Sequence, residues 1–262
     1  HTLLQSLRGR PQLRDRLALL PHLIDACQAL SYAHSRGVIH RDVKPANIMT
    51  GEFGETVLLD WGVAMTVGHP DFTAEKLRES LHLLKIDQVD ELEKTKTGTA
   101  LGTPHYMPPE QALGKIDEID HRSDVFGAGA VIYEILTGSP PFEGRDAKEI
   151  LWKVTHTPIR RIEELAPEAP PELVSICMKA LQREQAERYQ SMKALTDELV
   201  RFQTGALVRS HDYSPAQVVQ WWLRKYRKPL QVLGSGAVAA ALLLTYSYVS
   251  IWRARDSEQA QR

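Results

Sequence analysis

Cysteine is scarce in this chain of 262 residues, which contains only Cys27 and Cys177. The two lie far apart, each in an apolar stretch with helical spacing, so the chain lacks the cysteine pattern of a small disulfide-linked secreted domain. We expect two buried free thiols, which suit the reducing cytosol.

An excess of charge of one sign is also lacking, because 32 basic residues face 33 acidic ones. This balance gives no general reason to expect a nucleic-acid partner. Four histidines have no second His or Cys at the spacing of a zinc site, and we assign them to surface or packing roles. They are His34, His69, His82 and His156.

A leader segment is absent as well. The sequence begins at His1 without an initiator Met and enters a Leu-rich segment at once, so we expect a fragment. What is present, 262 residues of which 43% are hydrophobic, suffices for one sizeable core and an additional segment.

Helical periodicity dominates most of the chain. Apolar residues recur at helical spacing from Leu13 to Leu30, and Gly37 then provides a stop, which predicts one long helix with a kink at Pro21. The run 125–137 is apolar on all sides but too short to span a bilayer, which predicts a buried central helix. Further helices are predicted over 146–156, 171–182 and 191–203.

Two short β-type runs, Val38-Ile39 and Val57-Leu58-Leu59, follow the first predicted helix. Residues 51–54 form a turn ahead of the second run, so we expect a small hairpin here. Residues 63–101 are polar, which predicts a mobile insertion. Within it, a short helix is expected around Leu77, Leu81, Leu84 and Leu92.

Two short strings carry the chemistry: residues 40–47, His-Arg-Asp-Val-Lys-Pro-Ala-Asn, and residues 60–62, Asp-Trp-Gly. Phosphoryl transfer requires a carboxylate beside the attacking hydroxyl, a cation near the moving group and oxygen ligands for magnesium. The strings supply groups of these kinds as Asp42, Lys44, Asn47 and Asp60.

The order H-R-D-x-x-x-x-N followed by D-x-G resembles the catalytic-loop and metal-binding signature of the eukaryotic-type protein kinases, specifically their bacterial Ser/Thr branch. Later landmarks of that family appear in the same order, over residues 102–110 and 123–127 and at Arg188. The resemblance covers about residues 1–203. It implies the mainly α C-terminal lobe of the two-lobed α+β kinase fold, with a small β-hairpin region.

The resemblance implies catalytic roles. Asp42 would accept the hydroxyl proton, and Lys44 would offset charge on the phosphoryl group. Asn47 and Asp60 would hold Mg²⁺ beside ATP, and Met49 matches the position that forms the floor under the adenine ring.

Structural support is implied for four more residues. Glu110 and Arg188 would form a buried ion pair. Asp124 would cap the central helix and accept hydrogen bonds from the backbone of the catalytic loop, to which His40 belongs.

The activation segment bears on substrate class and regulation. Lys44, together with Thr103 in the loop after that segment, favours Ser/Thr over Tyr substrates. Arg41 would be a buried cation, and a phosphate on the activation segment is a suitable partner for it. Candidate sites for that phosphate are Thr95, Thr97 and Thr99. The alternative is that these threonines form only a solvated loop.

Three features depart from the family pattern. Trp61 stands where the family has Phe, and Pro109 where it has Ala. The Gly-rich phosphate loop, strand Lys and helix Glu of the family would lie upstream of Leu3, so we expect weak nucleotide binding by this sequence alone.

A long uncharged run follows the kinase-like region. Residues 230–251 carry no charge and are long enough to cross roughly 30 Å of hydrocarbon. We predict a transmembrane helix over 230–252; a buried helix of a domain outside this sequence is the alternative. Aromatic residues near both ends suit interfacial positions. They are Trp221, Trp222, Tyr246, Tyr248 and Trp252.

The basic residues at 224–228 precede this run, and the positive-inside rule then places the kinase-like region in the cytoplasm. Small residues four apart offer a face for a homodimer, namely Ser235, Gly236, Ala239 and Ala240. The expected organisation is a kinase lobe over 1–203, a basic juxtamembrane linker over 204–229, the span, and the start of an extracytoplasmic tail over 253–262.

Together these features predict a single-pass protein of the cell membrane. In its complete form it would transfer the γ-phosphate of ATP to Ser or Thr hydroxyls of proteins, with Mg²⁺ as cofactor and no nucleic-acid partner. The alternative is a catalytically inactive kinase-like scaffold that binds protein partners at the membrane. The retained chemical groups favour the enzyme, and the lack of a small lobe in this sequence favours the scaffold.

Overall fold

The computed structural model describes residues 1–68, 73, 74, 78, 81, 104–226, 242–250 and 252. The chain divides into two compact units, His1–His211 and Asp212–Arg262. Several positions singled out from the sequence lie outside the described residues, namely Leu77, Leu84, Leu92, Thr95, Thr97, Thr99 and Thr103.

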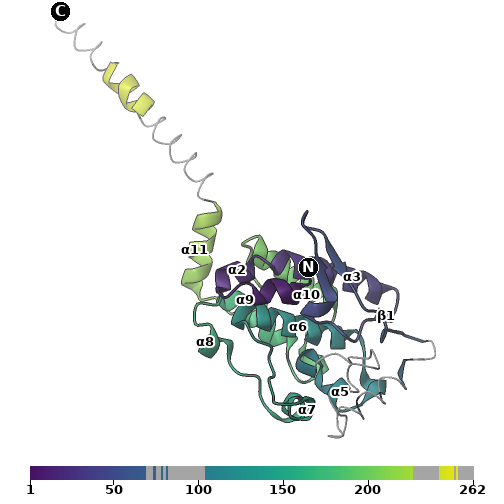
Figure 1. The fold of residues 1–262 in the computed structure, drawn as a ribbon. Helices are drawn as coiled ribbons and strands as arrows, with labels where there is room; N and C mark the ends of the chain where they lie inside the picture. Colours follow the sequence, from purple (N-terminus) through teal and green to yellow (C-terminus); the bar gives the residue numbers. More distant parts are fainter. Residues whose placement is uncertain are drawn as a thin grey trace, which may run out of the picture. The chain divides into compact units, whose positions relative to one another are not determined.

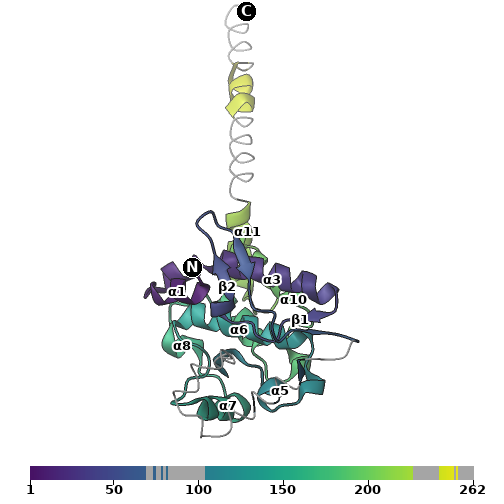
Figure 2. The same ribbon diagram turned by 45° about the vertical axis from the view of Figure 1, so that its right-hand side comes forward.

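Helix α6 (His121–Thr137) crosses the middle of the first unit, as Figure 1 and Figure 2 show from two directions. In both views α3 (Leu20–Ser35) and α10 (Met192–Gln203) lie on one side of it, and α5 (Pro109–Ala112) and α7 (Ala147–His156) on the other. Every residue of α6 from 123 to 136 is buried, which confirms the predicted central helix.

Two glycines let neighbouring segments approach α6 closely. A Cβ atom on Gly127 would lie 2.8 Å from the Cβ atom of Val43, and one on Gly129 would lie 2.8 Å from that of Ala180. Such distances are too short for real side chains, so the absence of a side chain is required at both places. The loop that contains Val43 therefore rests directly on α6.

The predicted helices around α6 are present, with ends that differ by at most two residues. The segments α7, α9 (Pro171–Ala180) and α10 correspond to the predictions over 146–156, 171–182 and 191–203. Asp146 and Ser191 cap α7 and α10 by accepting a hydrogen bond from a backbone N–H in the first turn. These observations confirm a mainly helical fold.

Smaller helices complete the first unit. They are α1 (Leu3–Arg8), α8 (Ile162–Leu165) and the 3₁₀ turns η1 (Pro45–Asn47), η2 (Pro104–Tyr106), η3 (Ile116–Glu118) and η4 (Gln185–Glu187). Helix α1 begins with a capping box between Thr2 and Gln5.

The prediction of one long helix from Leu13 to Leu30 is wrong. The structure has α2 (Leu13–Leu17) followed by α3, which begins at Leu20. Pro21 lies in the first turn of α3, where its missing N–H costs nothing, but it would clash with a preceding helical turn. Pro21 indicated a kink near this point, but the hydrophobic period continues across the break, and the periodicity therefore did not indicate two separate helices.

The small strands form two pairs. β2 (Ile48–Thr50) and β3 (Thr56–Leu58) are antiparallel around the turn at 51–54, and β1 (Val38–Ile39) pairs with β4 (Met65–Thr66). The hairpin therefore exists, but Val38-Ile39 is not one of its strands. A partner strand of only two residues carries too little pattern to be identified from the sequence.

The first unit continues to His211, beyond the boundary at 203 that composition suggested. Val208 is buried there. The carboxylate of Glu198 accepts hydrogen bonds from the backbone N–H groups of Arg209 (2.7 Å) and Ser210 (3.1 Å). These contacts join the segment after α10 to the core.

The second unit contains α11 (Pro215–Lys225), a helix within the predicted linker. Residues 242–250 and 252 are helical as well, and the remainder of the predicted span at 230–252 lies outside the described residues. In the described part of the chain, no helix combines the length and the apolar character needed to cross a membrane.

Candidate active site

The backbone is strained at both strings that the sequence singled out. Arg41 has φ 67° and Asp60 has φ 59°, in the left-handed region that side chains other than glycine rarely adopt. Such a residue costs on the order of 1–3 kcal/mol and persists only where the surrounding structure holds it. Neighbouring groups must therefore hold Arg41 and Asp60 in these conformations.

Asp124, in the first turns of α6, holds the loop at Arg41. Its carboxylate accepts hydrogen bonds from the backbone N–H groups of His40 (2.9 Å) and Arg41 (2.8 Å). A third contact, of 2.7 Å, comes from Nε2 of His34 on α3. Asp124 is only 1% exposed, so these bonds form away from solvent, where losing one is costly.

Three side chains meet beside this loop. Nζ of Lys44 lies 2.6 Å from Oδ2 of Asp42, and Nδ2 of Asn47 donates to the same oxygen at 2.9 Å. Nδ2 of Asn47 also donates to the backbone oxygen of Asp42 at 2.9 Å. Because Nδ2 is used twice, Oδ1 is the atom of Asn47 that is available as a ligand.

His40 links this loop to the segment that carries Asp60. Its Nδ1 accepts a hydrogen bond from the N–H of Asp42 (3.2 Å), so its Nε2 donates to the backbone oxygen of Leu59 (2.9 Å). The N–H of Leu59 in turn donates to the oxygen of Asn47 at 2.8 Å. Asn47 and Asp60 are thus carried by two directly bonded segments.

Asp60 follows β3 and has an exposed side chain whose Oδ1 lies 3.4 Å from the N–H of Gly62. The next residue, Trp61, packs against His40 with ring centroids 4.6 Å apart. Among the described residues, no group of three or more His, Cys, Asp and Glu side chains is placed to hold a metal ion. An Asn and Asp pair is the donor set of a Mg²⁺ site that shares its ion with phosphate oxygens and water, so these residues fit such an ion.

Comparison with known proteins agrees with this geometry. The model of the protein kinase domain matches residues 22–200 of the chain. The chain belongs to the protein kinase family.

Individual relatives are bacterial Ser/Thr kinases. The serine/threonine-protein kinase PknB of Mycobacterium leprae is 36% identical over 185 residues, which is 69% of this chain and 25% of that protein. PknB of Mycobacterium tuberculosis H37Rv is 35% identical over 187 residues, 70% of this chain and 26% of the relative. PknD of Protochlamydia amoebophila is 36% identical over 191 residues, 72% of this chain and 19% of the relative. The chain therefore spans about a quarter or less of the length of these curated relatives.

Glu110 and Arg188 form a bidentate ion pair outside residues 40–47, which we call the kinase loop. Nη1 and Nη2 of Arg188 lie 2.9 and 2.8 Å from the two carboxylate oxygens, and the Arg188 side chain is fully buried. The hydroxyl of Ser123 donates to Glu110 at 2.6 Å. Burial would raise the pKa of Glu110, but the hydrogen bonds and charge of Arg188, with Ser123, hold that pKa below its ordinary value.

A pocket opens beside Asp42. Its lining comes from the kinase loop, η2 and the residues after it, α5 and α6, and includes Asp42, Tyr106, Met107, Gln111, Asp124 and Gly127. The hydroxyl of Tyr106, one of these lining residues, donates to Oε2 of Glu134 at 2.6 Å. Burial raises the pKa of Glu134, and the hydrogen bond from Tyr106 opposes this only in part.

Two further predicted residues, Met49 and Arg41, lie near Asp42, Lys44 and Asn47 in the chain. Met49 is in the middle of β2 and is 41% exposed, whereas its neighbours Ile48 and Thr50 point into the unit. Arg41 is buried, and its Nη1 donates to the hydroxyl of Thr73 at 3.3 Å.

Sequence reasoning missed His34. The sequence predicts a surface or packing role for it, but in the structure it contacts the Asp124 carboxylate. Its partner is 90 positions away in sequence, and no local pattern connects the two. The sequence likewise gives no separate role to Ser123, which donates a hydrogen bond to Glu110.

Proposed function

We propose that the protein carrying this chain is a Ser/Thr kinase that transfers the γ-phosphate of ATP to hydroxyl groups of proteins. The supporting observation is the cluster of Asp42, Lys44 and Asn47 on a strained loop that Asp124 holds. The printed names of the relatives, which are serine/threonine-protein kinases, support the same activity.

Asp42 is the group that orients the substrate hydroxyl and accepts its proton. Lys44 and Asn47 both bind its Oδ2, which leaves Oδ1 for the hydroxyl. The two donors also fix the orientation of the Asp42 carboxylate beside the substrate hydroxyl. Lys44 is 9% exposed, and its charge would offset negative charge on the transferred group.

Asn47, through Oδ1, and Asp60, through its carboxylate, would hold Mg²⁺. When bound, this ion bridges phosphate oxygens of ATP and offsets their charge. Met49 would contact the adenine ring with its exposed thioether side chain. Lys44, with Thr103, would favour Ser and Thr over Tyr.

Regulation would act through Arg41. Phosphorylation of Thr95, Thr97 or Thr99 would supply an anion near this buried guanidinium and order the segment around it. Arg41 directly precedes Asp42 in the chain, so ordering Arg41 would also affect the position of Asp42.

The protein is further proposed to be a single-pass membrane protein, with the span at 230–252 and the kinase domain in the cytoplasm. The uncharged run, its aromatic flanks and the basic residues at 224–228 support this assignment. The small residues Ser235, Gly236, Ala239 and Ala240 would allow two spans to approach in a homodimer.

The test is phosphate transfer by the full-length protein and its Asp42→Asn variant, followed by mass spectrometry of protein substrates. We expect a loss of about a hundredfold or more, because Asn cannot accept the proton. Asp117→Asn, in η3, is the matched control and should retain activity. Equal activity of wild type and Asp42→Asn would refute the assignment, and an inactive wild type that still binds partners would establish the scaffold.

A further inference from the structure

Helix α11 carries an apolar face that the described structure leaves exposed. Val219, Trp222, Leu223 and Tyr226 follow the i, i+3, i+4, i+7 spacing of one helical face, and Val218 borders it. All five are exposed, Trp222 at 47% and Leu223 at 51%. Gln217 and Gln220 lie outside this face, and Trp221 lies on the same side as Gln217. The helix therefore has one apolar face and one mixed face.

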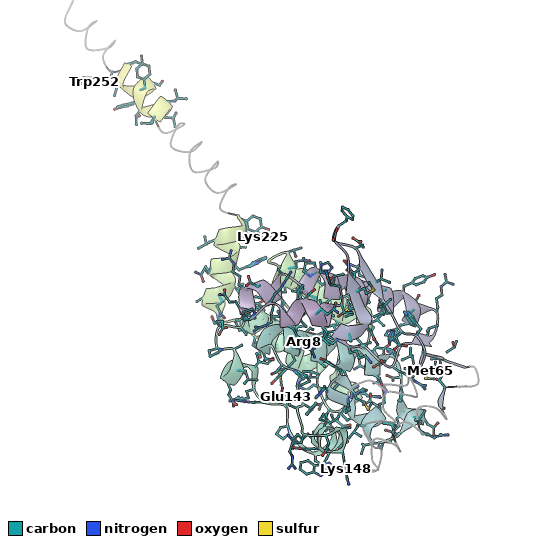
Figure 3. All side chains as sticks on the ribbon, viewed as in Figure 1. Arg8, Met65, Glu143, Lys148, Lys225 and Trp252 are labelled. Carbon is teal, nitrogen blue, oxygen red and sulfur yellow. The ribbon has the colours of Figure 1, made fainter. Side chains whose placement is uncertain are left out.

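The charged residues at the C-terminal end of α11 are all basic. No acidic residue occurs between Asp212 and Asp256, whereas basic residues stand at positions 224, 225, 227 and 228. Lys225, labelled in Figure 3, holds its Nζ 4.6 Å from the centroid of the Trp221 ring. Aromatic and basic side chains therefore lie together at one end of the helix, which suits the polar boundary of an anionic bilayer.

We propose that α11 lies in the surface of a membrane that contains anionic lipids, with the face formed by Val219, Trp222, Leu223 and Tyr226 turned to the acyl chains. The proposal rests on the proposed membrane span, because the uncharged run from 230 begins five residues after α11 ends. A helix so close to a span is held at the bilayer. The apolar face then favours insertion, and the basic residues favour anionic headgroups.

The test uses hydrogen exchange of residues 215–226 in the full-length protein, reconstituted into vesicles of phosphatidylcholine alone or mixed roughly 7:3 with phosphatidylglycerol. We expect exchange about tenfold slower in the anionic vesicles. Val219→Glu with Leu223→Glu should abolish the difference. Gln217→Glu with Gln220→Glu adds the same charge outside the apolar face and should retain most of it.

Flotation and phosphate transfer are measured on the same vesicles, so that failures can be told apart. A protein that does not float with vesicles disproves the span, and an inactive protein disproves the kinase, whatever α11 does. Flotation with equal exchange in both lipids overturns the proposal for α11. Exchange that is equally slow in lipid-free detergent also overturns it, because anionic lipid is then not what protects the helix.

Discussion

Two buried carboxylates that contact the start of α6 have different partners: Asp124 belongs to α6 itself, and Glu110 belongs to α5. Asp124 accepts hydrogen bonds mainly from backbone groups of the strained loop at 40–41, whereas Glu110 binds the side chains of Arg188 and Ser123. Ser123 and Asp124 are adjacent on the helix. The adjacent residues Ser123 and Asp124 thus take part in two separate networks: Asp124 positions the kinase loop, and Glu110, bound by Ser123 and Arg188, joins α5 to the segment after α9.

Removing Arg188 should have the largest effect on stability. Arg188→Ala leaves the buried Glu110 without its cation, and we expect the free energy of unfolding to fall by about 3–5 kcal/mol. Denaturant unfolding of the full-length protein measures this. Lys193→Ala, which breaks the exposed pair with Asp197, is the control and should cost about 0.5 kcal/mol or less. Equal losses in the two variants would show that the buried ion pair stabilises the fold no more than the exposed one.

Acid should lower the stability that the Glu110 network provides. The pKa of Glu110 is lower in the folded protein than its ordinary value of 4.5, so its contribution to stability is present above that pH. The contribution is lost as pH falls through the folded pKa. The pKa of Glu134 is raised, so its contribution has the opposite sign: stability falls as pH rises through the window above 4.5.

Unfolding curves between about pH 3 and pH 7 test both signs. Glu110→Gln should flatten the loss of stability in acid, and Glu134→Gln should steepen it, because the compensating group is gone. An unchanged acid dependence in Glu110→Gln would show that the ion pair does not set it.

His34→Ala should have the smallest effect. It removes one of three contacts to Asp124, so we expect kcat to fall a few-fold and stability to fall by about 1 kcal/mol. His156→Ala, at an exposed histidine stacked on Trp152, is the control and should leave kcat unchanged. If the two variants behave alike, His34 has the packing role that the sequence suggested.

The sequence predicted what is local and missed what joins distant segments. Asp42, Lys44, Asn47 and Asp60 stand within 20 positions, and the strings that contain them resemble the signature of the protein kinases. The contact between His34 and Asp124 spans 90 positions, and neither residue type signals the other.

The fold divides in the same way. The buried α6 was predicted because a run that is apolar on all sides, but too short to span a bilayer, fits a helix in the protein core. The break before α3 was predicted only as a kink at Pro21, because the apolar period passes through it. The β1–β4 pair was missed because two residues carry no pattern. Pairing and helix breaks depend on packing between segments, which periodicity does not contain.

The most direct measurement is to determine kcat and the free energy of unfolding together for Asp124→Asn in the full-length protein. Asn keeps the size of the side chain but offers one acceptor oxygen to a site that uses two, so the loop at His40 and Arg41 should lose a support. We predict that kcat falls about 10- to 100-fold, with a stability loss smaller than that of Arg188→Ala. Full kcat in Asp124→Asn would contradict the claim that this carboxylate positions the kinase loop.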